Sequence, residues 1–163
     1  MISSTDSIIV PLSVDFTTAN IQDNQVYDAL ISNLPPAIIK KMHYMIADPG
    51  YDDQKLYDLS MNLRFDPVCP VCRYKNTPQE RLQLIDFYES PLGQAIYSKR
   101  NTSIEPLIDH IKSVFRIDPA SVRGYDKVSA IVLLSVLLYQ ILVYYNCKLQ
   151  KDNPRAIKYM IGC

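Results

Sequence analysis

The sequence predicts an α/β fold in which helices cover a mixed β-sheet. Short β-branched or apolar runs alternate along the chain with stretches whose apolar residues recur every three to four positions. The resulting order of strand, helix, strand, helix, strand and further helices is typical of helices packed on a sheet. The chain has 163 residues, of which 48% are hydrophobic and 21% are charged, so it is long and apolar enough for one folded domain.

The first predicted strand and the first predicted helix lie within the opening 34 residues. Residues 7–20 are β-branched and weakly alternating, which indicates a strand or one arm of a hairpin. Residues 23–34 carry apolar side chains at helical spacing, after a capping Asp23 or Asn24. The following Pro-Pro pair cannot continue a helix, so we expect the helix to end there.

A strand that ends in an acidic residue follows. Residues 43–53, "HYMIADPGYDD", predict a buried strand with Asp48 at its carboxyl end and a tight turn after it. A helix is predicted over 52–63, and a short strand that runs into a Pro-rich loop over 64–76. An alternative role for Asp48 is to cap this turn or the helix that starts near Asp52.

Residues 78–115 are helical in pattern, with Leu82 and Ile85 among the residues of one apolar face. We expect an interruption near Gly93. A new helix is predicted to start in "NTSIEP", because Pro106 fits best in a first helical turn.

The run 128–145 has fifteen apolar positions out of eighteen, which approaches the length of a membrane span. A helix buried in a protein core has the same composition, and we favour that interpretation because the α/β pattern needs covering helices. A membrane anchor is the alternative. The N-terminus lacks the pattern of a signal peptide, so the expected location is the cytoplasm, without a membrane partner.

The charged and sulfur-containing residues indicate no obvious ligand. Seventeen basic residues balance seventeen acidic ones, so a nucleic-acid interface would have to rest on local patches. The four cysteines are expected to be reduced thiols. Cys69 and Cys72 have the spacing of half a zinc site, but no second pair exists, so we interpret them as loop thiols.

Two acids stand out by their surroundings. Asp48 sits at the edge of an apolar strand, where an unpaired charge is costly. Glu105 and Lys112 are seven residues apart, which places them on one face of a helix, beside an apolar stripe of Ile104, Ile108 and Ile111. An acid beside bases could hold a divalent cation while the bases hold phosphate oxygens. The alternative for Glu105 is an ordinary acid in the first turn of a helix.

Three stretches resemble the DDE transposases of bacterial and archaeal insertion sequences, over about residues 8–148. "PLSVDFTTANIQD" resembles the strand and turn before the first core helix, and "MIADPGYDD" the segment of the second catalytic Asp. "YSKRNTSIEPLIDHIK" resembles the Tyr-Arg-Glu-Lys signature, with four residues between Arg and Glu where the family usually has three.

The resemblance implies a ribonuclease H-like catalytic core and a site with two Mg²⁺ ions. Asp48 and Glu105 would be catalytic residues and metal ligands. Tyr97, Arg100 and Lys112 would contact DNA, the implied partner. The implied reaction is metal-dependent cleavage and transfer of DNA strands at transposon ends.

The family's first Asp has no counterpart here, because Asp6 and Asp15 do not lie in the matching context. We therefore expect a partial catalytic domain over 1–150, without the first strands of its sheet, and a C-terminal tail over 151–163. Such a chain should be inactive alone and poorly soluble or dependent on a partner, either the N-terminal part of the transposase or a second copy. Two alternatives are a non-catalytic DNA-binding or oligomerising module and a small membrane-associated protein anchored by 128–145.

Overall fold

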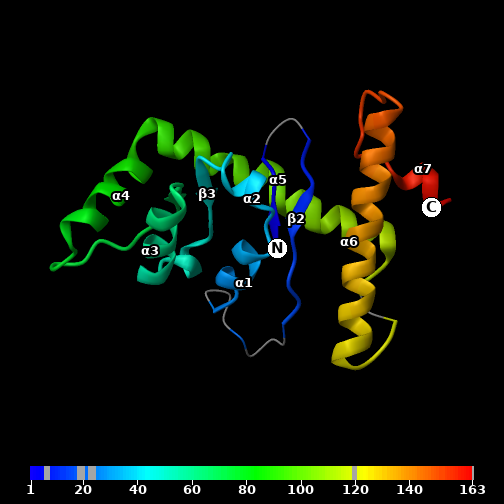
Figure 1. Cartoon of the computed structure of the whole chain (residues 1–163), viewed down its shortest axis with the longest axis horizontal. Coiled ribbons are helices and arrows are strands. Elements are labelled where there is room, and N and C mark those ends of the chain that lie inside the picture. The colour runs from blue at the N-terminus through cyan, green and yellow to red at the C-terminus, as the bar shows by residue number, and fades with distance from the viewer. Residues whose placement is uncertain (6–7, 18–20, 22–24, 119–120, 163) are drawn as a thin grey trace. The chain divides into compact units, whose positions relative to one another are not determined.

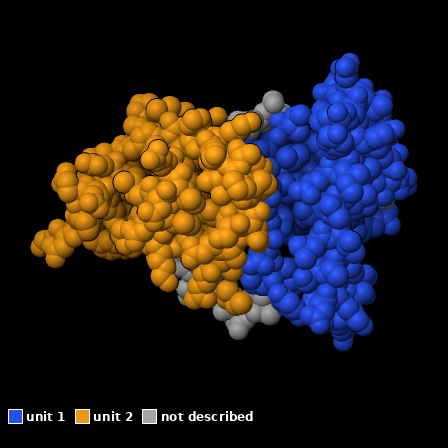
Figure 2. Space-filling model, viewed as in Figure 1, with its two compact units in different colours: residues 1–19, 101–163 blue, residues 20–100 orange. Residues whose placement is uncertain are grey.

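The computed structural model describes residues 1–5, 8–17, 21, 25–118 and 121–162 (Figure 1). The chain divides into two compact units, which are coloured in Figure 2: unit 1 comprises 1–19 and 101–163, and unit 2 comprises 20–100. Four residues singled out in the sequence lie outside the described residues: Asp6, Asp23, Asn24 and Cys163.

Unit 2 contains a parallel β-α-β element. Strand β3 (Tyr44–Ile46) pairs in parallel with β4 (Asp66–Val68), and helix α3 (Gln54–Leu63) connects them. Helix α3 begins where it does because the extended residue Asp53 caps it, accepting a hydrogen bond of 2.9 Å from the backbone N–H of Lys55. The predicted order of strand, turn, helix and strand is confirmed, although β3 is half-buried to exposed along its length and not buried as predicted.

Three shorter elements and one longer helix also belong to unit 2. Helix α1 (Tyr27–Ser32) ends before the Pro-Pro pair, as predicted, and α2 (Pro36–Ile39) starts at its second proline. The 3₁₀ turn η2 (Pro49–Tyr51) follows β3, and α4 (Gln79–Glu89) follows the Pro-rich loop. The main buried apolar side chains of this unit are Tyr27, Leu30, Ile31, Leu34, Leu56, Phe65, Val68 and Ile85.

Helix α5 (Pro91–Phe115) starts two residues after α4 ends, so the predicted interruption lies at Ser90 and not at Gly93. The Ser90 hydroxyl accepts a hydrogen bond of 3.1 Å from the backbone N–H of Gly93. A Cβ at position 93 would lie 2.1 Å from the carbonyl oxygen of Phe87. Glycine is therefore required there by the close approach of the two helices, and it does not end one of them.

The prediction of a new helix start in "NTSIEP" is wrong, because α5 continues through Pro106. A proline inside a helix removes one backbone hydrogen bond. The residues beyond it on one face, Leu107, Ile111 and Val114, are at most 3% exposed. Burial of each of these apolar side chains contributes about 1.5–3 kcal/mol, and together this offsets the cost of the proline.

Unit 1 combines a hairpin with helices. Strands β1 (Ile2–Ser3) and β2 (Pro11–Ser13) are antiparallel, which confirms a hairpin arm within 7–20. Helix α6 (Tyr125–Lys148) follows α5 in the chain, and α7 (Lys158–Ile161) lies near the C-terminus. The core of the unit consists of Leu107, Ile111, Val114, Val136, Tyr139, Val143 and Ile157.

The α/β class is confirmed. The described residues form two separate two-stranded sheets, β1-β2 and β3-β4. A ribonuclease H-like mixed sheet remains a prediction.

Helix α6 is buried on one face only. Val136, Tyr139 and Val143 face the core, whereas Leu134 and Ile141 are 63% and 53% exposed. Only 22% of the most apolar 18-residue stretch of α6 is buried, so the helix packs on the core but is not buried all round as expected. The reason is that the core cluster covers a single side of the helix. Among the described residues, α6 is the one helix long and apolar enough to cross a membrane, a test that core helices also pass.

The exposed face of α6 should cause self-association. An apolar surface of this kind is rarely left in contact with water. The double variant Leu134→Lys, Leu137→Lys should move the purified chain to smaller species in sedimentation velocity. Leu92→Lys is the control, since Leu92 is also an exposed leucine, 57% exposed, on another helix. Equal effects of the two variants, or recovery of the wild-type chain with membranes in fractionation, would contradict the expectation.

The segment after α6 packs back onto that helix. The Asn146 side-chain amide donates hydrogen bonds of 2.9 Å to the carbonyl oxygen of Pro154 and 3.5 Å to that of Ala156, and Tyr159 donates one of 2.7 Å to Asn146 Oδ1. Ile157 is fully buried. The division into a catalytic domain over 1–150 and a tail over 151–163 remains a prediction.

Candidate functional site

Asp48 lies just beyond the carboxyl end of β3. It occupies the position before the 3₁₀ turn η2 in an extended conformation, and its side chain makes no capping hydrogen bond. Helix α3 is capped by Asp53. The partner that the structure gives to the Asp48 carboxylate is Arg100, whose Nη2 lies 2.7 Å from Oδ1. The capping role considered for Asp48 is therefore not the one that the structure shows.

Tyr97 lies beside this ion pair. Burial raises the pKa of Tyr97, and the nearby Arg100 lowers it while Tyr88 and Asp48 raise it further. The rings of Tyr88 and Tyr97 meet edge to face, with centroids 5.3 Å apart. The Arg100 side chain is 22% exposed and that of Asp48 is 46% exposed. The structure thus brings together three of the five predicted site residues, all within unit 2.

Glu105 and Lys112 belong to unit 1, on the same helix α5. Both are exposed, and two helical turns separate them, so they share a face. Lys112 Nζ lies 3.6 Å from Asp118 Oδ2. Of the predicted apolar stripe only Ile111 is fully buried.

The buried stripe of this part of α5 is Ser103, Leu107, Ile111 and Val114. Ile104 and Ile108 of the predicted stripe are half-buried, because the core contacts a face rotated towards Leu107.

The carboxylates suit a hard divalent cation such as Mg²⁺, which prefers oxygen ligands. Within the described part of the chain, however, no group of three or more His, Cys, Asp or Glu residues is gathered to hold a metal. Asp48 is instead neutralised by a guanidinium group.

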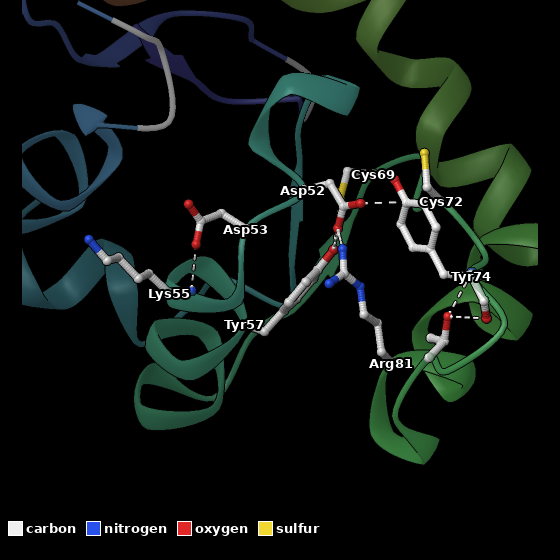
Figure 3. A network of polar contacts seen from close by, with 9 residues as sticks. Asp52, Asp53, Lys55, Tyr57, Cys69, Cys72, Tyr74 and Arg81 are labelled. Carbon is white, nitrogen blue, oxygen red and sulfur yellow. Dashed lines mark hydrogen bonds and ion pairs between the residues drawn. The ribbon is translucent and has the colours of Figure 1, made fainter.

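A second polar cluster, centred on Asp52, was missed by the sequence analysis (Figure 3). Asp52 Oδ1 accepts a hydrogen bond of 2.5 Å from the Tyr57 hydroxyl and forms an ion pair with Arg81. Its Oδ2 lies 3.4 Å from the backbone nitrogen of Cys72. The guanidinium carbon of Arg81 lies 5.5 Å from the centre of the Tyr57 ring. Figure 3 shows Asp52, Tyr57 and Arg81 pointing toward one another, which ties α3, α4 and the Pro-rich loop together.

The cysteine pair lies beside this cluster. Cys69 is 1% exposed, its Sγ lies 3.7 Å from the Tyr57 hydroxyl, and burial raises the pKa of its thiol. Burial and then the hydrogen bond to Asp52 raise the pKa of Tyr57 as well. A thiol that stays protonated is a poor metal ligand, because the thiolate is the form that binds. Cys72 is exposed.

Comparison with known families places the chain in one of them. The model of the family described as the transposase DDE domain matches residues 4–141. No curated protein and no solved structure matches the chain.

Proposed function

The chain belongs to the transposase DDE domain family, whose reaction is DNA transposition, and we propose that Asp48 and Glu105 are two of its catalytic carboxylates. The observation that carries the proposal is the position of Asp48. It follows a strand of a parallel pair, at the carboxyl end where α/β folds place their sites. Its Oδ1 also lies 2.7 Å from Nη2 of Arg100, a residue that the family signature implies contacts DNA.

Arg100, Tyr97 and Lys112 are the proposed DNA contacts. A guanidinium can hold two phosphate oxygens at once, and a lysine ammonium acts as a point charge on the DNA backbone. Because the net charge of the chain is zero, binding must come from such local groups. The pairing of Arg100 with Asp48 implies an exchange, in which a phosphate replaces the carboxylate as the partner of Arg100.

Asp48 and Glu105 would hold the divalent cation, Mg²⁺ in our proposal, which stabilises negative charge on the reacting phosphate. This requires the two carboxylates to come together, and a ribonuclease H-like sheet is the arrangement we propose for it. We also propose that the chain alone has little cleavage activity, because neither Asp6 nor Asp15 lies in the context of the family's first Asp. The first carboxylate would come from sequence outside residues 1–163, and the reaction would take place in the cytoplasm.

The exposed face of α6 favours one alternative, an oligomerising module that binds DNA without cutting it. In such a module the proposed DNA contacts would remain, but Asp48 and Glu105 would have no catalytic role.

DNA binding is the first property to test. The wild-type chain should bind a short labelled DNA duplex in fluorescence anisotropy, with an affinity that falls as KCl rises. Lys112→Ala should weaken binding and reduce the slope of log K against log salt by about 0.9, because one phosphate contact is lost. Lys151→Ala is the control, since Lys151 is an exposed lysine outside the signature. Binding that does not depend on salt, or equal effects of both variants, would contradict the proposal.

A further inference from the structure

Unit 1 has a pocket that the proposed function does not use. It is an open hollow of about 600 Å³ between α5 and the segment after α6. The pocket is lined by His110, Asn153, Arg155, Ala156, Lys158 and Tyr159. Of these residues, only His110 falls within the match to the family.

The walls of the pocket are held by hydrogen bonds. Tyr159 donates to Asn146 Oδ1 at 2.7 Å, which fixes the end of its side chain to α6. Arg155 Nε donates to the Tyr139 hydroxyl at 3.3 Å, and the backbone N–H of Arg155 donates to Asn153 Oδ1 at 3.1 Å. The buried Ile157 anchors the segment between them. The side chains of Arg155 and Tyr159 are therefore positioned before any ligand arrives.

The pocket carries positive charge without a matching acid. Among the described residues, no carboxylate forms an ion pair with Arg155 or Lys158. His110 Nε2 is buried and has no hydrogen-bond partner within this described part of the chain. Burial lowers the pKa of His110, and the charges of Arg155 and Lys158 lower it further, while a hydrogen bond with the Arg155 backbone partly offsets this by raising it. A buried polar nitrogen and two cations facing one hollow are groups that an anion would satisfy.

We propose that this pocket binds the phosphate group of a nucleotide. Arg155 and Lys158 would hold the phosphate oxygens, and His110 Nε2 would contribute a further polar contact. The volume is typical of a pocket for a small organic ligand and exceeds what a phosphate ion alone requires. The ring of Tyr159, 59% exposed, offers a surface on which a base can stack. The nucleotide could be free or part of a DNA strand, and neither Asp48 nor Glu105 takes part.

The chain has two histidines, so its imidazole NMR signals report on the pocket directly. His110 lies in the pocket, and His43, in unit 2, is an internal control. Thymidine monophosphate, added to the full chain, should shift the His110 signals saturably and leave those of His43 in place. Lys158→Gln should weaken this binding about tenfold, because one charge-assisted contact is lost. Lys151→Gln, at an exposed lysine outside the lining, should not.

A comparison of probes distinguishes the sources of the phosphate. If a short oligothymidylate binds more tightly than the monophosphate, the pocket holds a DNA strand. If the monophosphate binds more tightly, the pocket holds a free nucleotide. Inorganic phosphate that binds as well as the monophosphate would overturn the nucleotide assignment. No shift of His110 with any probe, or equal losses in the Lys158 and Lys151 variants, would overturn the proposal. Lys112→Ala should leave the titration with thymidine monophosphate unchanged, so this result is separate from the test of the proposed function.

Discussion

Replacing Asp48 with alanine should abolish magnesium-dependent nicking of DNA while DNA binding is retained. Loss of a carboxylate that holds the cation removes several kcal/mol of charge stabilisation, about a hundredfold to ten-thousandfold in rate. Binding should be kept or improved, because the variant frees Arg100 from the carboxylate that lies 2.7 Å from it. This combination of lost cleavage and retained binding distinguishes a catalytic residue from a structural one.

The assay is nicking of supercoiled plasmid with and without Mg²⁺. It is run on the chain alone and together with a polypeptide that supplies the family's first carboxylate, since we expect little activity from the chain alone. Asp66→Asn is the matched control, because Asp66 is an exposed acid on β4, the strand paired with β3. Nicking by Asp48→Ala at the rate of the Asp66 variant would remove Asp48 from the catalytic site. The absence of magnesium-dependent nicking from every combination would favour the non-cutting DNA-binding module.

Replacing Asp52 with alanine should destabilise the chain by about 3 kcal/mol. The Asp52 and Arg81 side chains are 12% and 21% exposed, so removal of the acid leaves a largely buried guanidinium without its counter-charge. The Tyr57 hydroxyl also loses the acceptor at 2.5 Å. The free energy of unfolding, measured in urea, tests this expectation.

The neighbouring acid is the control for this measurement. Asp53→Ala removes the cap of α3 and should cost about 1 kcal/mol. In a double-mutant cycle, Arg81→Met should reduce the cost of Asp52→Ala, because the buried positive charge is then absent. A loss no larger for Asp52→Ala than for Asp53→Ala would show that the ion pair adds little to stability.

Local patterns in the sequence determined the class of fold and the order of its first elements. Apolar spacing and the Pro-Pro pair defined α1, and an apolar run followed by Asp-Pro-Gly defined β3 and its turn. These features depend on neighbours within a few residues, which is the range over which periodicity and turn preferences act. The order of the transposase motifs was likewise enough to identify the family, and the match over residues 4–141 confirms it.

The tertiary structure alone decided which partners the charged and apolar groups have. Asp52 pairs with Arg81, 29 residues away, and Asp48 with Arg100, and no local pattern specifies such pairs. Packing of Leu107 in the core keeps α5 helical through Pro106, although a proline by itself prefers the first turn of a helix. In the same way, the core covers one side of α6 and leaves the other exposed. Burial and charge pairing act through space between distant segments, so their outcome depends on packing that residue spacing does not contain.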